Sequence, residues 1–321
     1  MKIRLIAAVC LLGCAVCSQA GTIRSDRPDS LYQDLAASPG YAGVGQFIGT
    51  TSNSSFAASG TLIAPDWVLT AAHVVDQATS LTFKIGGNSY AGSTWAYHSK
   101  WTGDLAAGYD IGLVKLSSVP GIAPAARYTG SSELGAVGTS AGYGMTGTGL
   151  TGAITFDSVK RAGQNVIDRY YSNRSNRIVI SDFDNPNRPS DSAFGSSSPL
   201  DLEYLIAPGD SGGGLFVDLG SGPRLAGVHS FGTALDGLIN SDYGDISGHT
   251  RVSVFNSWID SILSGGSGVS GGGKGGKGRP FSANEMEFDA VWITAVPEPG
   301  SLALLLLGAV GLFAWRRSSR C

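Results

Sequence analysis

The nine residues Pro208-Gly-Asp-Ser-Gly-Gly-Gly-Leu-Phe216 place a serine between glycines, directly ahead of an apolar stretch that is typical of a β-strand. A serine hydroxyl is a weak nucleophile, so it needs a base within hydrogen-bond reach. Glycines beside it let backbone N–H groups approach a carbonyl oxygen as negative charge develops there. We therefore predict that Ser211 is a nucleophile for acyl transfer.

Two upstream segments carry side chains that suit the remaining roles. Trp67-Val-Leu-Thr-Ala-Ala-His73 is an apolar strand that runs into small residues and a histidine, and Asp110-Ile-Gly-Leu-Val-Lys-Leu116 has an aspartate ahead of an alternating strand. Imidazole titrates near neutral pH, so it can accept the serine proton and return it to a leaving group. A carboxylate on the other ring nitrogen fixes the tautomer. We expect His73 to be the general base and Asp110 to orient it.

These segments resemble the trypsin-like (S1-type) serine proteases of the chymotrypsin fold, in which His, Asp and Ser follow in this chain order. Further similar stretches are Ser59–Ile63, Gly142–Gly144, Ser230–Gly232 and Ser257–Ile259, all in the order of the family. The resemblance covers the body of the chain, residues 40–263. It implies an all-β fold of two six-stranded antiparallel β-barrels with a C-terminal α-helix, and a site in the crevice between the barrels.

The sequence pattern favours the same fold class on its own terms. Short β-rich runs alternate with turns of Gly, Ser and Asn, which is typical of an all-β barrel or sandwich. One helix is expected at Val252–Leu263, where Val252, Phe255, Ile259 and Leu263 recur at helical spacing. The expected strands are Gly43–Thr50, Ser59–Ile63, Trp67–Ala71, Ser80–Ile85, Ile111–Leu116, Gly135–Tyr143, Ile178–Ser181, Gly214–Val217 and Arg224–Ser230.

The resemblance implies further roles around the nucleophile. The N–H groups of Gly209 and Ser211 would form the oxyanion hole, and Asp210 would shape their loop. No Arg or Lys precedes an Ile-Val-Gly-Gly start, so an ion pair between Asp210 and a new N-terminus is in doubt. Arg127, Arg161 or no cation at all remain as partners of Asp210.

Substrate preference is less firmly implied. Ser230, Phe231 and Gly232 would pair with the substrate backbone, and Leu205, six positions before the nucleophile, would lie at the floor of the pocket for the P1 side chain, the residue before the cleaved bond. Three preferences stay open: an apolar P1 residue, an acidic one through His229, or a basic one through Asp245.

The two ends of the chain look like export signals. Residues 1–20 combine Lys2 and Arg4 with an apolar run and small residues at 18–20, which predicts removal by signal peptidase before Gly21. At the other end, Val296-Pro297-Glu298-Pro299 precedes a 15-residue apolar run and an Arg-rich tail. This end resembles the PEP-CTERM sorting segment of Gram-negative bacteria. It implies a short transmembrane helix, transient anchoring, and processing by an exosortase-type enzyme near Pro297-Glu298-Pro299.

The resulting organisation has five parts. They are a signal peptide at 1–20, an N-terminal segment at 21–39, the protease domain at 40–263, a Gly-rich linker and spacer at 264–295, and the sorting segment at 296–321. After removal of the tail, the protein would be at the cell surface, in the extracellular matrix or secreted.

Composition excludes several other classes. The net charge is −3, and the two ends of the chain are basic, so the body between them is more acidic than this value suggests. Nucleic acid is therefore not an expected partner. The four cysteines are Cys10, Cys14, Cys17 and Cys321, which excludes a disulfide framework in the body. A Ca²⁺ site at Asp182, Asp184 and Asp191 is conceivable, but a solvated loop is expected there, with no metal and no cofactor.

The expected function is a secreted serine endopeptidase that acts on a protein or peptide substrate through an acyl-enzyme. The alternative is a non-catalytic matrix or binding protein on the same fold. The complete set of His73, Asp110 and Ser211 favours the enzyme.

Overall fold

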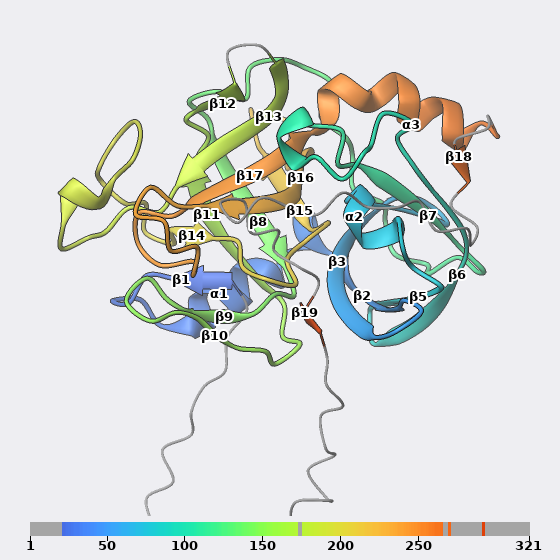
Figure 1. Ribbon diagram of the computed structural model, residues 1–321, viewed down its shortest axis with the longest axis horizontal. Helices are drawn as coiled ribbons and strands as arrows, with labels where there is room; N and C mark the ends of the chain where they lie inside the picture. Colours follow the sequence, from blue (N-terminus) through green and yellow to red (C-terminus); the bar gives the residue numbers. More distant parts are fainter. Residues whose placement is uncertain (1–20, 173–174, 266–268, 271–290, 293–321) are drawn as a thin grey trace, which may run out of the picture.

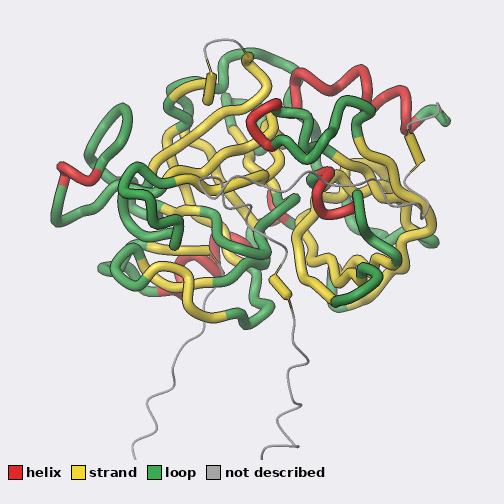
Figure 2. Tube along the Cα trace, viewed as in Figure 1, coloured by secondary structure: helices red, strands yellow, loops and turns green. Residues whose placement is uncertain are grey.

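Two β-barrels lie side by side in the computed structural model, which describes residues 21–172, 175–265, 269–270 and 291–292 (Figures 1 and 2). Strands and connecting loops make up nearly all of the fold, and the few helices are short. The predicted signal peptide and sorting segment lie outside the described residues. Within the described part of the chain, no helix is both long and apolar enough to cross a membrane.

The first barrel is a closed antiparallel sheet of six strands. Its neighbours follow the order β6-β5-β2-β3-β4-β7, and β6 pairs with β7 to close the ring. The barrel interior is filled by side chains with no exposed surface, such as Phe47, Leu62, Phe83 and Leu113. The strands are β2 (Val44–Thr50), β3 (Ser55–Ala64), β4 (Trp67–Thr70), β5 (Ser80–Ile85), β6 (Asn88–Tyr97) and β7 (Gly112–Leu116). Two further short strands, β18 (Val269–Ser270) and β19 (Val291–Trp292), pair with β6 and β3.

The second barrel is an antiparallel sheet in the order β11-β8-β15-β16-β17-β13-β12. The sequence analysis predicted six strands for this barrel. The sheet contains six strands and a seventh, β12 (Arg169–Ser172), which extends it at one end. The six are β8 (Val137–Gly142), β11 (Arg161–Val166), β13 (Ser175–Asp182), β15 (Gly214–Val217), β16 (Arg224–Thr233) and β17 (Ile246–Arg251). The predicted all-β fold with two barrels and a C-terminal helix is confirmed.

A third, smaller sheet was not expected from the sequence. The N-terminal strand β1 (Gly21–Ile23) lies between β9 (Thr146–Thr148), to which it is parallel, and β14 (Tyr204–Leu205), to which it is antiparallel. Strand β10 (Gly152–Thr155) completes this sheet beside β9. Helix α1 (Asp29–Ala36) follows β1 and contacts β11. The first residues of the described chain are therefore built into the second half of the molecule (Figure 1).

The remaining helical elements are short. Helix α2 (Ala72–Val75) directly follows β4, and 3₁₀ turns occur at Pro39–Tyr41, Leu105–Ala107 and Pro189–Asp191. The expected helix at 252–263 is present as a 3₁₀ turn, Val252–Phe255, followed by helix α3 (Asn256–Leu263). Val252, Phe255 and Ile259 are buried in the core that the first barrel shares with neighbouring elements, so the apolar face was predicted correctly.

A buried ion pair joins the segment between the barrels to the end of β17. Arg251 donates to both carboxylate oxygens of Glu133, at 2.7 and 2.8 Å, and the Ser253 hydroxyl donates to one of them at 3.0 Å. The Glu133 side chain has no exposed surface and that of Arg251 is 3% exposed. Two parallel N–H···O bonds of this kind fix both side chains in direction as well as in distance.

Candidate active site

His73 and Asp110 come from the ends of two neighbouring strands. Strand β4 ends at Thr70 and leads into α2, and Thr70 pairs with Gly112 at the start of β7. The intervening Ala71 and Ala72 have no exposed surface, so their small side chains let His73 lie close to the sheet. His73 Nδ1 is 2.8 Å from Asp110 Oδ2, and the His73 backbone N–H donates to Asp110 Oδ1 at 3.0 Å. The Asp110 carboxylate thus holds both the ring and the backbone of His73.

A third contact to Asp110 comes from the second barrel. The Ser230 hydroxyl of β16 donates to Asp110 Oδ2 at 2.5 Å, and Asp110 has no exposed surface. A carboxylate on Nδ1 leaves Nε2 as the nitrogen that can face a serine hydroxyl. We had expected Ser230 to contact substrate, and its contact with Asp110 was not foreseen. The Ser-Phe-Gly motif was the signal in the sequence, but the pattern alone does not tell which group the hydroxyl meets.

The Ser211 loop belongs to the second half of the molecule but docks on the first barrel. The Ser59 backbone N–H donates to the Ser211 carbonyl at 2.8 Å, and the Ser59 hydroxyl donates to the Gly209 carbonyl at 3.0 Å. Gly212 lies against Thr70 so closely that a Cβ there would be 1.9 Å from the Thr70 hydroxyl oxygen, and its φ is +81°. These contacts bring Ser211 beside β4, the strand that leads to His73.

The peptide planes on both sides of Asp210 are fixed by hydrogen bonds to their carbonyl groups. The Pro208 carbonyl accepts from the Met145 N–H, and the Asp210 carbonyl accepts from the Gly213 N–H. In a trans peptide the N–H points opposite to the C=O. The N–H of Gly209 therefore faces away from Met145 and the N–H of Ser211 faces away from Gly213. Both N–H groups that the sequence singled out are thus held in a set direction.

The stretch that carries these residues also matches a known family. The family model described as Trypsin matches residues 37–259. This chain belongs to the trypsin family. Members of the trypsin family are serine endopeptidases, so the predicted enzyme class is confirmed. Residues 295–318 match a second family model, the PEP-CTERM protein-sorting motif.

Solved structures of the trypsin family share the fold. A structure of HL collagenase is 21% identical, with a TM-score of 0.54, and the alignment covers 71% of this chain and 96% of the collagenase. Neuropsin, a serine protease expressed in the limbic system of mouse brain, is 18% identical with a TM-score of 0.53; its alignment covers 71% of this chain and 97% of neuropsin. At these identities the likeness establishes the fold alone. No curated protein matches the sequence.

Two residues that the sequence analysis expected at the substrate pocket are buried. Leu205 on β14 has no exposed surface, and Phe231 on β16 is 5% exposed. The Phe231 ring contacts the Tyr171 ring edge to face at 5.3 Å and lies over Gly248 of the neighbouring strand, where a Cβ would be 2.5 Å from the ring. Leu205 and Phe231 thus give β14 and this part of β16 an apolar character.

His229 is paired with another histidine inside the second barrel. It lies opposite His249 in the register of β16 and β17, and the two Nδ1 atoms are 2.9 Å apart. Burial and the neighbouring His249 lower the pKa of His229 well below its ordinary value, and burial lowers that of His249 to about 3. Both rings are neutral at pH 7, so neither supplies a positive charge to an acidic P1 side chain.

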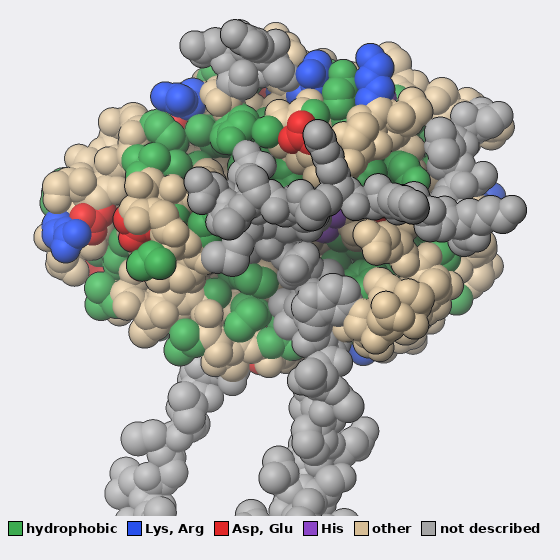
Figure 3. Space-filling view, viewed as in Figure 1, with side chains coloured by type: hydrophobic (Ala, Val, Ile, Leu, Met, Phe, Trp, Pro, Cys, Tyr) green, Lys and Arg blue, Asp and Glu red, His purple; other side chains and the backbone are tan. Residues whose placement is uncertain are grey.

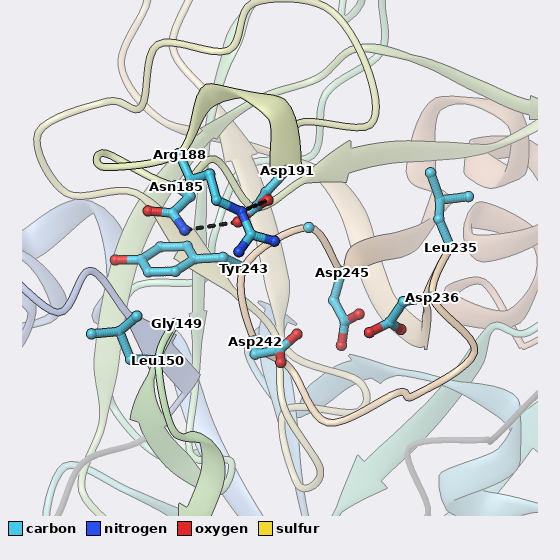
Figure 4. A pocket seen from close by; sticks show the side chains of 11 residues that line it. Gly149, Leu150, Asn185, Arg188, Asp191, Leu235, Asp236, Asp242, Tyr243 and Asp245 are labelled. Atoms are coloured by element: carbon cyan, nitrogen blue, oxygen red, sulfur yellow. Dashed lines mark hydrogen bonds and ion pairs between the residues drawn. The ribbon is translucent and has the colours of Figure 1, made fainter.

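Asp245 lines a different cavity, shown in Figure 4. The cavity has a volume of about 340 Å³, and none of its lining residues belongs to the triad or to the Ser211 loop. The carboxylates of Asp236, Asp242 and Asp245 gather on one side of it, and Arg188 approaches Asp191 on the other. Burial and the nearby Asp242 raise the pKa of Asp245 to about 7. This arrangement gives no support to a basic P1 preference through Asp245.

The loop after β13 is only partly the solvated loop that we expected: residues 187–190 and 195–198 are exposed, but its first carboxylates are not. Asp182 and Asp184 are only 2% and 6% exposed. Asp182 accepts from the Ser192 hydroxyl and from the N–H groups of Ala193 and Phe194, so the loop folds back over this carboxylate. Burial and then Asp182 raise the pKa of Asp184 to about 6. Across the described ranges, no three His, Cys, Asp or Glu side chains gather in a way that could hold a metal ion.

Both cations that we considered as partners of Asp210 are engaged elsewhere. Arg127 binds Asp260 and Asn256 near α3. Arg161 binds Asp29 and Asp157. Neither of these two cations forms an ion pair with Asp210. The sequence did not reveal that α1 brings Asp29 to Arg161. On the face drawn in Figure 3, most of the visible Lys and Arg side chains stand at the upper edge and the left end.

Proposed function

We propose that this chain is an exported serine endopeptidase that cleaves peptide bonds through an acyl-enzyme, with His73, Asp110 and Ser211 as its triad. The observation that carries the proposal is the double contact of Asp110 with the ring and backbone of His73, completed by Ser230. This contact sets the ring so that Nε2 can serve Ser211 as a base.

The reaction uses one general base for two displacements. Ser211 Oγ attacks the substrate carbonyl carbon while His73 Nε2 takes its proton, and the C–N bond then breaks as His73 returns the proton to the leaving amine. Water next attacks the acyl ester, with His73 again taking the proton, and Ser211 leaves with its proton restored. The N–H groups of Gly209 and Ser211 receive the negative oxygen of each tetrahedral intermediate.

The substrate would lie along β16 as an additional extended strand. Ser230, Phe231 and Gly232 provide its backbone partners, as the family resemblance implies. Leu205 at the pocket floor, together with the neutral His229, favours an apolar P1 side chain, because neither supplies a charge. A hydrophobic pocket discriminates by size and desolvation.

Export and sorting complete the proposal. The chain enters the export pathway through residues 1–20, which signal peptidase removes. The PEP-CTERM motif at 295–318 supports surface sorting with cleavage by an exosortase-type enzyme near Pro297-Glu298-Pro299. Anchoring by the apolar run before that cleavage belongs to this proposal, and the run lies outside the described residues.

Labelling with a fluorophosphonate probe, which reacts only with activated serines, tests the catalytic proposal. The exported wild-type chain is expected to be labelled, and Ser211→Ala is expected to show no labelling at an unchanged melting temperature. A folded wild-type chain that takes no label would contradict the proposal and leave the non-catalytic binding protein.

Digestion of a peptide library tests the P1 preference. We expect kcat/KM for the best apolar P1 residue to exceed that for Glu, Lys or Arg in the same sequence by about 10- to 200-fold, since apolar discrimination has this range. Equal or faster cleavage after Glu, Lys or Arg would contradict the apolar preference.

A further inference from the structure

Asp210, next to Ser211, is held by hydrogen bonds and not by an ion pair among the described residues. Its carboxylate is fully buried, and it accepts from the Gly144 N–H at 2.8 Å, the Ala207 N–H at 3.0 Å and the Tyr204 hydroxyl at 3.2 Å. No Lys or Arg among the described residues forms an ion pair with it. A buried carboxylate is expensive to maintain unless hydrogen bonds compensate for the lost water. Of these three donors, only Tyr204 supplies a side chain.

The position of the Asp210 carboxylate controls the direction of the neighbouring peptides. Asp210 lies between Gly209 and Ser211, and its backbone N–H donates to the Ala207 carbonyl at 2.9 Å. The same carboxylate binds the Ala207 N–H, so side chain and backbone of Asp210 close the loop together. If the carboxylate lost one of its three donors it could shift, and the two flanking N–H groups would shift with it.

Tyr204 is fixed in place by two glycines. A Cβ at Gly21 of β1 would be 2.0 Å from the Tyr204 ring and hydroxyl, and a Cβ at Gly163 of β11 would be 2.3 Å from the Tyr204 Cβ. The backbone of β1 also pairs with β14, with Ile23 opposite Tyr204. Because the packing is this close, the Tyr204 ring can adopt only one position. Burial and Asp210 raise the pKa of Tyr204 well above its ordinary value, so the phenol keeps its proton and donates it.

We infer that Tyr204 is the positioning residue of the oxyanion loop: its hydroxyl, held by the N-terminal strand β1, orients Asp210 and thereby aims the N–H groups of Gly209 and Ser211. The inference rests on the proposed function, because it explains how that site keeps its geometry. It makes the strand that begins at Gly21 part of the catalytic apparatus, although β1 contributes no reacting atom.

Tyr204→Phe tests this role, because it removes the hydroxyl and retains the ring. We expect kcat to fall on the order of 10- to 100-fold, with KM within about two-fold, since a hydrogen bond to a charged group and the aim of the oxyanion donors are lost. Tyr32→Phe is the matched control. Tyr32 belongs to the same buried cluster, but its hydroxyl donates to the Glu203 carbonyl and not to Asp210. Its loss should lower the melting temperature and leave kcat unchanged.

The pH profile separates positioning from plain stability. Asp210 is faced by Tyr204 from β14 and by the charge of Arg161 from β11, which is itself bound to Asp29 of α1. Burial raises the pKa of Asp210 to about 6, and the three hydrogen bonds oppose this rise. Loss of the Tyr204 donor raises it further, so the acid limb of kcat should move to higher pH in Tyr204→Phe and stay in place in Tyr32→Phe.

Equal melting-temperature losses in the two variants, with kcat and its pH profile unchanged in both, would overturn the inference. If Tyr204→Phe does not fold, Gly21→Ala serves instead, because its methyl group displaces the ring while the hydroxyl remains; unchanged kcat there would also overturn the inference. Fluorophosphonate labelling of the wild type runs in parallel. A labelled wild type with unaffected variants contradicts only the role of Tyr204, whereas an unlabelled wild type contradicts the proposed function.

Discussion

Asp110→Asn is expected to lower kcat by about 10⁴-fold with little change in KM. The amide would present an N–H₂ group to His73 Nδ1, where the carboxylate now lies 2.8 Å away. His73 would then carry its proton on Nε2 and could not accept the proton of Ser211. Steady-state hydrolysis of a peptide ester and amide measures the effect, and the melting temperature shows whether the fold is retained.

Asp76→Asn is the control for this substitution. Asp76 lies at the end of the same short helix and accepts a hydrogen bond from the Trp101 indole at 3.2 Å. It should keep kcat within about two-fold, because no group that moves a proton is changed. A fall of less than ten-fold in Asp110→Asn would show that His73 is oriented by other groups.

Glu133→Gln is expected to lower the free energy of unfolding by about 3–5 kcal/mol. The substitution leaves the Arg251 guanidinium buried, with its bidentate carboxylate partner replaced by a neutral amide. The positive charge then lacks compensation in a place that water does not reach. Urea unfolding followed by tryptophan fluorescence measures the change.

Asp201→Asn provides the matched comparison for that ion pair. Asp201 binds Arg27 at 2.8 Å, but its side chain is 70% exposed. Solvent screening reduces the contribution of such a pair to about 0–1 kcal/mol. Similar losses in the two variants would mean that burial does not set the strength of the Glu133–Arg251 pair.

The sequence predicted the parts of the fold that are long or chemically distinctive. The strands around His73, Asp110 and Ser211 alternate in hydrophobicity or end in unusual residues, so the two-barrel fold could be predicted from the chain and these three side chains could be named as candidates. Strands β1, β9 and β14 have two or three residues each, too few to show a period. The third sheet was therefore missed, and with it the contact between Tyr204 and Asp210.

The other missed contacts depend on strand register. His229 and His249 are 20 residues apart and meet only because β16 and β17 place them opposite each other. Ser230 reaches Asp110 from the other barrel across 120 residues of sequence. Pattern reasoning assigns residues to strands, but register and packing between barrels follow from the whole fold. The search for a cationic partner of Asp210 failed for the same reason.

The placement of β1 has a consequence for how the chain folds. Its residues meet partners 125 and 183 positions further along, at Thr146 and Leu205. Contacts of such high sequence separation raise the contact order and delay folding, because a long loop must close before they form. The third sheet can be completed only after the chain has been released to beyond Leu205. The residues of β1 thus wait unpaired until β9 and β14 are available, and the loop that holds Asp210 and Ser211, which packs on this sheet through Tyr204, becomes ordered only then.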